Sequence, residues 1–239
     1  MSAYVDARQS TRRRRRTRRW VIAVLVVVVL LVGADFVAKT IAEQVAATQF
    51  QKQGKLSAKP DVTIEGFPFL TQVAAKDIGQ IKVGISNLKE GPVTFSSVNA
   101  DATSVRLKSY AFNSGTIGHI RGTALISFSS LANTLTTEFG PLGDLLNGVG
   151  LNLSAAGPDE VKANVSLVGS ATWRITRVDA HTLNAKLISS SGLLRQLNSV
   201  GSKTFTIPPL PLGLTLDSLA VTPSGIVGII SSSNAPFGS

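Results

Sequence analysis

The 239-residue chain contains no cysteine, only two histidines and few aromatic residues. Without cysteine there are no disulfides, no thiol catalysis, no thiolate zinc site and no lipid-modified cysteine of a bacterial lipoprotein. The sequence also lacks G-x-S-x-G, H-E-x-x-H, a P-loop, and G-x-G-x-x-G after an expected strand. We therefore predict no catalytic residue, no metal site, no cofactor and no enzymatic activity.

Three residues are the remaining candidates for polar chemistry. His119 lies among glycines, which is typical of a surface imidazole. His181 neighbours Asp179, a pair that can orient a general base, although an ordinary polar strand end explains it without a nucleophile motif. Trp173 is interpreted as a half-buried strand aromatic, with a stacking platform for sugar or lipid headgroups as the alternative. These side chains keep an enzyme that acts on a glycolipid open as an alternative.

The net charge of +10 is concentrated at the amino terminus. Residues 1–19 hold eight arginines against one aspartate, whereas residues 60–239 hold twelve Lys or Arg against eleven Asp or Glu. Because the remainder is nearly neutral, it has no basic stripe of the kind that follows phosphates. We therefore predict no nucleic-acid partner, and the arginines are interpreted as a topology signal.

An apolar run, residues 20–38, follows the arginines directly. About 19 residues at ~1.5 Å per residue span about 28 Å, close to the hydrocarbon thickness of a bilayer. Asp35 lies near its far end, and Val32-Gly33-Ala34 resembles a cleavage site. Residues 20–38 are therefore either an uncleaved signal anchor or a cleaved signal peptide. The arginines orient the amino terminus (residues 1–19) to the cytoplasm, with the rest outside the cell membrane or exported to the periplasm or cell envelope.

Residues 39–59 are predicted to form a helical stalk or the first packed helix of the domain. Val37, Ile41 and Val45 recur at helical spacing on one face, and Lys39 and Glu43 point away from it.

Period-two alternation dominates residues 60–232 and predicts half-buried antiparallel strands. Two short helices interrupt it, one after Ser129 or Ser130 and one after Ser190 or Ser191. Residues 233–239 are predicted to be a flexible tail. The fold class is α+β, mostly antiparallel β, and the pattern leaves open a curved sheet around an apolar space or a filled β-sandwich. The strands are expected in the following segments: 81–88, 103–109, 124–128, 160–169, 172–178, 181–187 and 212–221.

Two proline-containing segments are more apolar than ordinary loops. GFPFL occupies residues 66–70, and Pro208, Pro209 and Pro211 precede a leucine-rich strand. Proline does not occupy central strands, so both segments are expected at an edge or turn. They either cover the ends of a core or line the mouth of a lipid site.

Several motifs together carry a resemblance. A basic terminus, a membrane-like segment and a helix lead into PDVTIEGFPFLTQ (residues 60–72) and GQIKVGISNL, and PPLPLGLTLDSLAVTPSGIVGII (residues 208–230) follows near the end. Over residues 35–232 the chain resembles the LmeA-type phospholipid-binding family of actinobacterial cell-envelope proteins. The GFPFL segment is the specific motif, and the middle of the chain resembles the family mainly in pattern.

The resemblance implies a sheet curved around one or more helices, as in tubular lipid-binding proteins such as bactericidal/permeability-increasing protein. It also implies an extracytoplasmic domain that binds phospholipid or another acylated envelope lipid and serves envelope lipid or lipoglycan maintenance. The alternative function is a structural or adaptor domain that binds an envelope protein, of unknown identity, through an exposed sheet edge. Apolar residues of the motifs and strands are the expected lipid-binding set: Ile64, Phe67, Phe69, Leu70, Val83, Ile85, Val165, Leu210, Leu212 and Leu214.

Overall fold

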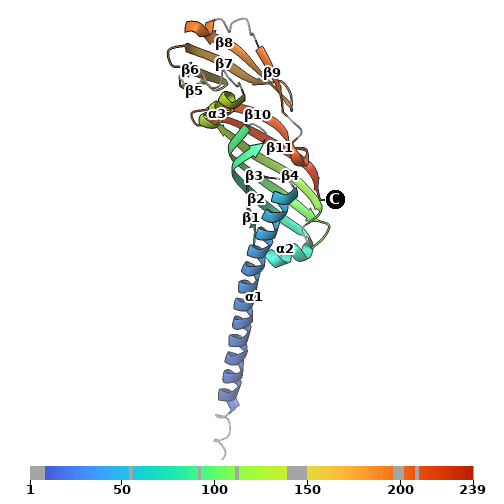
Figure 1. Ribbon diagram of the computed structural model, residues 1–239. Helices are drawn as coiled ribbons and strands as arrows, with labels where there is room; N and C mark the ends of the chain where they lie inside the picture. Colours follow the sequence, from blue (N-terminus) through green and yellow to red (C-terminus); the bar gives the residue numbers. More distant parts are fainter. Residues whose placement is uncertain are drawn as a thin grey trace, which may run out of the picture.

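A computed structural model describes residues 9–53, 56–90, 93–110, 113–138, 150–195, 202–207 and 210–238. The parts lie end to end (Figure 1): a long helix projects from the base, a six-stranded sheet follows, and a five-stranded sheet lies at the far end. The architecture is α+β with antiparallel pairing in every described strand pair, as the sequence predicted.

The first sheet, sheet A, carries the long strands. Its spatial order is β1-β2-β3-β4-β11-β10, so the last two strands of the chain return beside β4. The bounds are β1 Asp61–Glu65, β2 Asp77–Glu90, β3 Val93–Leu107, β4 Gly115–Ser127, β10 Thr215–Thr222 and β11 Gly225–Phe237.

Sheet B is a meander of five sequential strands inserted between β4 and β10. Helix α3 (Phe128–Glu138) lies at the junction of the two sheets in Figure 1. The strand bounds are β5 Leu151–Gly157, β6 Glu160–Val165, β7 Gly169–Arg177, β8 Thr182–Ser190 and β9 Ser202–Thr206.

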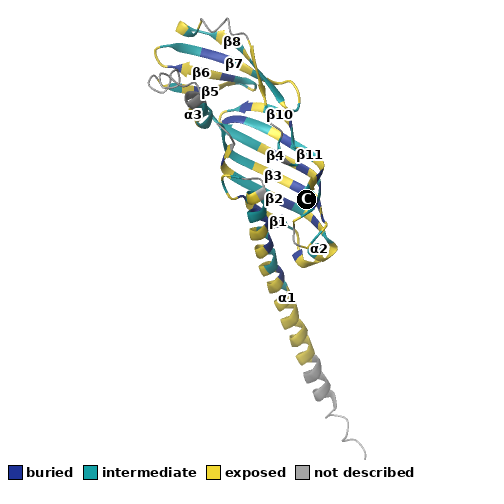
Figure 2. Cartoon of the chain, turned by 45° about the vertical axis from the view of Figure 1, so that its right-hand side comes forward, coloured by how far each residue is buried: buried dark blue, intermediate teal, exposed yellow. Residues whose placement is uncertain are grey.

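Helix α1 (Gln9–Gln53) is a single element that contains the apolar run and the predicted stalk as far as Gln53, whereas residues 56–59 are not helical. Its upper part packs on sheet A through small side chains, Ala42, Ala46 and Ala47, which allow a close approach between helix and strands. Figure 2 shows the change along the helix: the lower turns are exposed, and buried positions begin where the helix meets the sheet.

Sheet A curves around α1. Val62 and Ile64 from the edge strand β1 belong to the same buried cluster as the α1 alanines, and Leu212 and Leu214, which precede the opposite edge strand β10, pack against that cluster. Side chains from both edges therefore meet around one helix. This confirms the curved sheet wrapped around a helix that the resemblance implied.

A crease crosses sheet A near its base. Pairing skips Gly79, Ser104, Gly118 and Asn234, which lie at one level of four neighbouring strands. Ser104 and Asn234 have φ of 56° and 52°, and a Cβ on Gly118 would lie 2.8 Å from the Ser104 Cβ. On β3, buried positions are even-numbered above the crease (Ala102) and odd-numbered below it (Val105). The crease thus switches which side chains face α1 and sharpens the bend of the sheet.

The apolar face predicted for the stalk points away from the sheet. Val37, Ile41 and Val45 are exposed, whereas Glu43, predicted to point away, lies at the contact with β1. Periodicity identified the helix, but the side facing the sheet is set by the fit of small alanines, which contribute little to an apolar moment.

Two other local predictions have mixed outcomes. Residues 233–239 were expected to fray, but β11 continues to Phe237 because Ser233, Ala235 and Phe237 pair with β4, and Ala235 is buried in the α1 cluster. Helix α3 begins at Phe128, before both serines that were expected to cap it, and Ser127 Oγ instead accepts from the backbone N–H of Ser130 at 3.2 Å. The second predicted helix is described only over residues 192–195, as one 3-10 turn, and the rest lies outside the described residues.

We predict that Ala46→Leu lowers the free energy of unfolding by about 1–3 kcal/mol, because the larger side chain cannot fit between α1 and the strands. The measurement is the denaturant midpoint of the detergent-solubilised chain, followed by circular dichroism. Val45→Leu, on the exposed side of the same turn, is the control and is expected to change stability by less than about 0.5 kcal/mol. Equal midpoints for both variants and the parent chain would contradict the packing of α1 on sheet A.

Candidate functional site

GFPFL forms the turn that joins β1 to the short helix α2 (Phe69–Ala75) at the base of sheet A. β1 ends at Glu65, and Gly66 has φ of +98°, a conformation that L side chains rarely adopt. A Cβ at Gly66 would also lie 2.6 Å from Nε2 of Gln72. Pro68 then occupies the N-cap of α2 and has no side-chain group that accepts a hydrogen bond. The predicted turn just beyond the first strand is confirmed.

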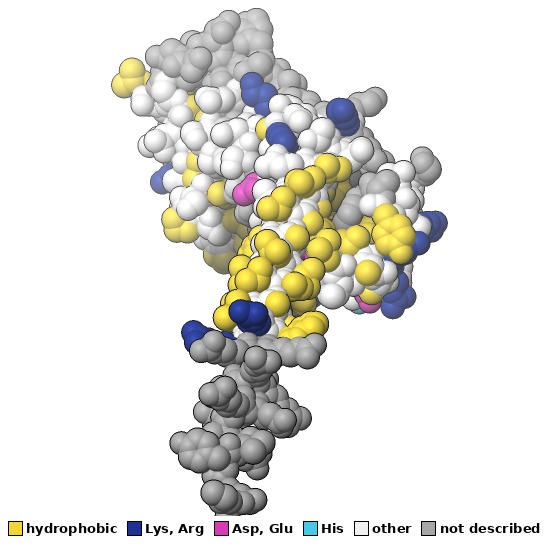
Figure 3. Space-filling view, turned by 90° about the horizontal axis from the view of Figure 1, so that it is seen from below, with side chains coloured by type: hydrophobic (Ala, Val, Ile, Leu, Met, Phe, Trp, Pro, Cys, Tyr) yellow, Lys and Arg dark blue, Asp and Glu magenta, His cyan; other side chains and the backbone are white. Residues whose placement is uncertain are grey.

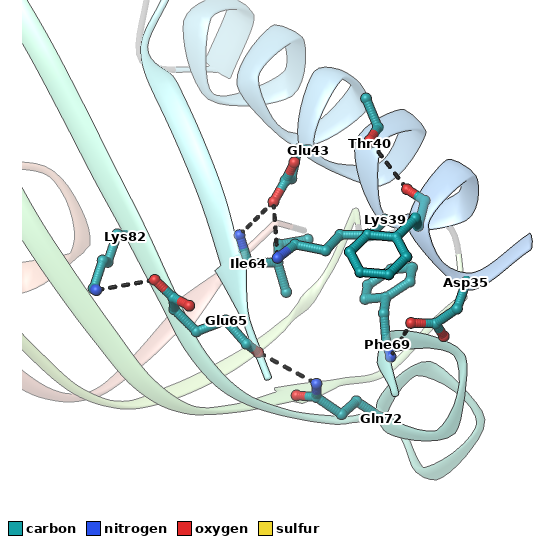
Figure 4. A network of polar contacts seen from close by, with 10 residues as sticks. Asp35, Lys39, Thr40, Glu43, Ile64, Glu65, Phe69, Gln72 and Lys82 are labelled. Carbon is teal, nitrogen blue, oxygen red and sulfur yellow. Dashed lines mark hydrogen bonds and ion pairs between the residues drawn. The ribbon is translucent and has the colours of Figure 1, made fainter. Parts of the chain in front are cut away.

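Asp35 of α1 supplies the acceptors that Pro68 lacks. The backbone N–H of Phe69 donates to Asp35 Oδ2 at 2.9 Å, and that of Leu70 donates to Oδ1 at 2.7 Å. Figure 4 shows the carboxylate pointing at the first turn of α2. The Asp35 side chain is buried, with 4% exposed, and a carboxylate at a helix N-terminus is favoured by the helix dipole. A residue of the long helix therefore caps a second helix that follows it by more than thirty positions.

A second carboxylate joins α1 to β1 two turns farther up. Glu43 Oε1 accepts from the backbone N–H of Ile64 at 2.8 Å and lies 3.8 Å from Lys39 Nζ. In Figure 4 these contacts and those of Asp35 lie along the same side of α1. Gln72 closes the turn, since its Nε2 donates to Glu65 O at 3.2 Å and its Oε1 accepts from Gly79 N at 3.0 Å.

Glu65 and Lys82 form an ion pair on the outer surface of β1 and β2, with 2.9 Å between Oε1 and Nζ. The hydrogen bond from Lys82, followed by its Coulombic attraction, lowers the pKa of Glu65 below its ordinary value, and the reciprocal contacts raise the pKa of Lys82. Both side chains are well exposed, so the pair contributes little to stability.

The inner face of sheet A carries an apolar strip above the α1 cluster. We define the central strip as Val83, Ile85, Val98, Ala100 and Ala124. These residues are paired across β2, β3 and β4: Val83 opposite Ala100, Ile85 opposite Val98, and Val98 opposite Ala124. All five are half-buried, and Ile85, Val98 and Ala124 belong to neither described core cluster.

The central strip lies between two packed regions. Below it, Val83 and Ala100 border the α1 cluster. Above it, a second cluster joins Val221 and Ile226 of sheet A to Phe128 of α3 and to sheet B. Gly228 continues the strip on β11 opposite Ala124, so the strip is lined by small side chains as well as branched ones. It offers a half-buried apolar surface with no charged side chain among its five members.

The predicted lipid-binding residues do not gather in one place. Ile64 and Phe69 are buried in the α1 cluster, and Leu212 and Leu214 pack against it. Phe67 and Leu70 are exposed at the base.

The other four are dispersed. Val83 and Ile85 lie in the central strip, Leu210 is half-buried, and Val165 is buried in sheet B. The structure thus brings Val83 and Ile85 together with Val98, Ala100 and Ala124, which sequence reasoning missed. The signal that could have found Val98 and Ala100 is the apolar alternation in the segment 98–102, and Ala124 begins the expected strand 124–128.

The polar candidates lie apart from this strip. Asp179 Oδ1 accepts from the backbone N–H of His181 at 2.7 Å, and this contact is the leading cause that lowers the pKa of Asp179. His119 lies within β4 and is exposed, as interpreted. Trp173 is half-buried against the second cluster, as interpreted. Among the described residues, no three His, Asp or Glu side chains converge on a metal position.

A pocket of about 340 Å³ lies where α1 meets β1. Glu43, Gln44, Lys59 and Thr63 line it, and Lys59 Nζ donates to Gln44 Oε1 at 2.9 Å. This polar lining does not suit an acyl chain.

Comparison with known proteins gives one match. The model of a family described as LmeA-like phospholipid-binding matches residues 33–229, most of the chain. No curated protein and no solved structure matches it. Within the described residues, the segment 18–52 of α1 is long and apolar enough to cross a membrane, a property that a signal sequence near the amino terminus shares.

We predict that Asp35→Ala destabilises the base of the domain, because the buried N–H of Phe69 loses its acceptor at a cost of about 1–3 kcal/mol. Hydrogen exchange measured by mass spectrometry should show faster exchange in residues 64–76. Asp35→Asn keeps one acceptor oxygen and should have a smaller effect. Asp61→Ala, an exposed aspartate at the start of β1, is the control. Unchanged exchange in Asp35→Ala would show that α2 does not depend on this carboxylate.

Proposed function

Since the chain belongs to the LmeA-like phospholipid-binding family, we propose that it is a membrane-anchored extracytoplasmic protein that holds the acyl chains of a phospholipid on the central strip. In this role it carries or senses lipid for the maintenance of envelope lipid or lipoglycan, by binding and without catalysis. Its partners are phospholipid or another acylated lipid and the cell membrane.

The observation that carries the proposal is the half-buried row of Ile85, Val98 and Ala124. It is apolar, continuous across three strands and outside both described clusters. Burial of each methylene contributes about 0.8 kcal/mol, so a chain of a dozen carbons is held without strong polar contacts. The family description supports the ligand class, and the strip supports the place where its chains lie.

The anchor is supported by α1 itself. The apolar turns below Asp35 are exposed in Figure 2 and continue without a break into the packed part of the helix. The arginines before Trp20 favour a cytoplasmic amino terminus. A domain that is rigidly joined to this helix then lies outside, next to the lipid surface.

An adaptor function is the second candidate, and one observation favours it. β9 is an edge strand of sheet B, all five of its residues are exposed, and Phe205 is among them. An exposed edge is a template for strand addition by a protein partner. In-cell crosslinking from β9 to one dominant protein, together with absence of bound lipid, would favour this function over lipid binding.

We predict that Val98→Glu weakens phospholipid binding by about tenfold or more, because a carboxylate against acyl chains is desolvated without a partner. The assay is photo-crosslinking of the full chain in nanodiscs with a phospholipid that carries a diazirine near the end of one acyl chain, with crosslinked peptides identified by mass spectrometry. The parent chain should be labelled in β3 and β4.

Asn99→Glu is the matched control, because Asn99 is exposed on the opposite face of the same strand. It should retain labelling, and circular dichroism should show both variants folded. Equal labelling of Val98→Glu and Asn99→Glu would refute the placement of the lipid on the central strip.

A further inference from the structure

The base of the domain exposes a small group of large apolar side chains beside the apolar part of α1. Phe36 on α1 is 59% exposed, and Phe67 and Leu70 of the GFPFL turn are 62% and 43% exposed. The rings of Phe36 and Phe67 are stacked, with 6.2 Å between centroids and 29° between planes. We call these three residues the apolar tip. Seen from below, hydrophobic side chains run along α1 and spread onto the adjoining base (Figure 3).

The apolar tip is held in place by buried neighbours. Phe69 lies between Phe67 and Leu70 in the sequence, and its side chain is buried in the α1 cluster. Its backbone N–H and that of Leu70 are bonded to Asp35. The turn therefore buries one of its apolar residues and presents the two flanking ones outward, next to the helix that leads to the membrane.

The length of the apolar helix indicates what covers the tip. Residues 20–34, between the last arginine and Asp35, span about 22 Å at ~1.5 Å per residue, whereas the hydrocarbon core of a bilayer is about 30 Å thick. With Arg19 at the cytoplasmic surface, the hydrocarbon therefore extends about five residues beyond Ala34, to the level of Lys39. Phe36 and Val37 lie in this stretch, and Phe67 and Leu70 lie beside it. The one charge there, Asp35, is buried in protein and accepts two N–H groups.

We propose that the apolar tip is immersed in the outer leaflet of the bilayer that α1 spans, so that the domain itself completes the apolar span. This inference rests on the proposed membrane anchoring. The polar surroundings fit an interface: the Nζ of Lys76, which ends α2, lies 4.5 Å from the centroid of the exposed Tyr110 ring. Aromatic and cationic side chains of this kind are enriched at the level of the headgroups.

The absence of cysteine makes a direct test simple. Leu70→Cys is spin-labelled in the full chain, which is reconstituted in nanodiscs of phosphatidylcholine and phosphatidylglycerol. Power saturation then compares collisions of the label with oxygen, which concentrates in the bilayer, and with a water-soluble nickel complex. Phe67→Cys provides a second site on the tip. Val29→Cys in the apolar part of α1 reports the anchor, and Leu167→Cys, in the fully exposed turn between β6 and β7, reports solvent.

The proposal expects oxygen-dominated collisions at Leu70, Phe67 and Val29, and nickel-dominated collisions at Leu167. Nickel-dominated collisions at Leu70 and Phe67 with oxygen-dominated collisions at Val29 would overturn the immersion of the tip and leave the anchor intact. Nickel-dominated collisions at Val29, or its loss from the mature chain, would overturn the anchoring and the immersion together.

Discussion

The bond between the Asp35 carboxylate and the first turn of α2 is the contact on which the rest of the arrangement depends. It joins the point where α1 leaves its apolar stretch to the point where β1 turns into α2. Because the carboxylate is buried, its charge is tolerated only while both N–H groups are in place. The sequence of the GFPFL turn is consistent with this, because Pro68 provides no side-chain cap of its own and Phe69, whose N–H donates to Asp35, is buried.

From this fixed corner, the sheet closes on the helix. Glu43 accepts a hydrogen bond from β1, and the small alanine side chains of α1 allow the strands to pack closely against the helix. The crease at Ser104 and Gly118 bends the sheet around the helix. The lower part of the curved sheet is consequently filled by protein. Above the filled part, the same inner face continues as the central strip, where the side chains are small or branched and only half-buried. This division leaves the central strip available to a ligand, because the core side chains pack against the lower part of the sheet and do not cover the strip.

Sequence reasoning predicted the class of the fold and the nature of most elements, because alternation and helical spacing are local properties. It identified the turn at Pro68 for the same reason. It did not predict which residues face α1, because the crease inverts the alternation within β3, so that Ala102 and Val105 lie on the same face. Nor did it assign a role to Asp35 beyond its place near a membrane interface, since a hydrogen bond across more than thirty residues leaves no local pattern. Of the five residues of the central strip, the sequence singled out only Val83 and Ile85. The residues that lie opposite them on β3 and β4 are determined by strand register, which the sequence pattern does not give.

The continuity of α1 has a geometric consequence for the whole molecule. A helix advances by about 1.5 Å and turns by about 100° with each residue, and no break separates its apolar turns from those that carry Asp35 and Glu43. In the proposed membrane-anchored arrangement, the number of residues below Asp35 therefore sets both the height of the domain above the bilayer and the direction in which its curved sheet faces within the membrane plane. Adding or removing a single residue there would preserve every contact within the domain and yet rotate the domain by about 100° about the helix axis.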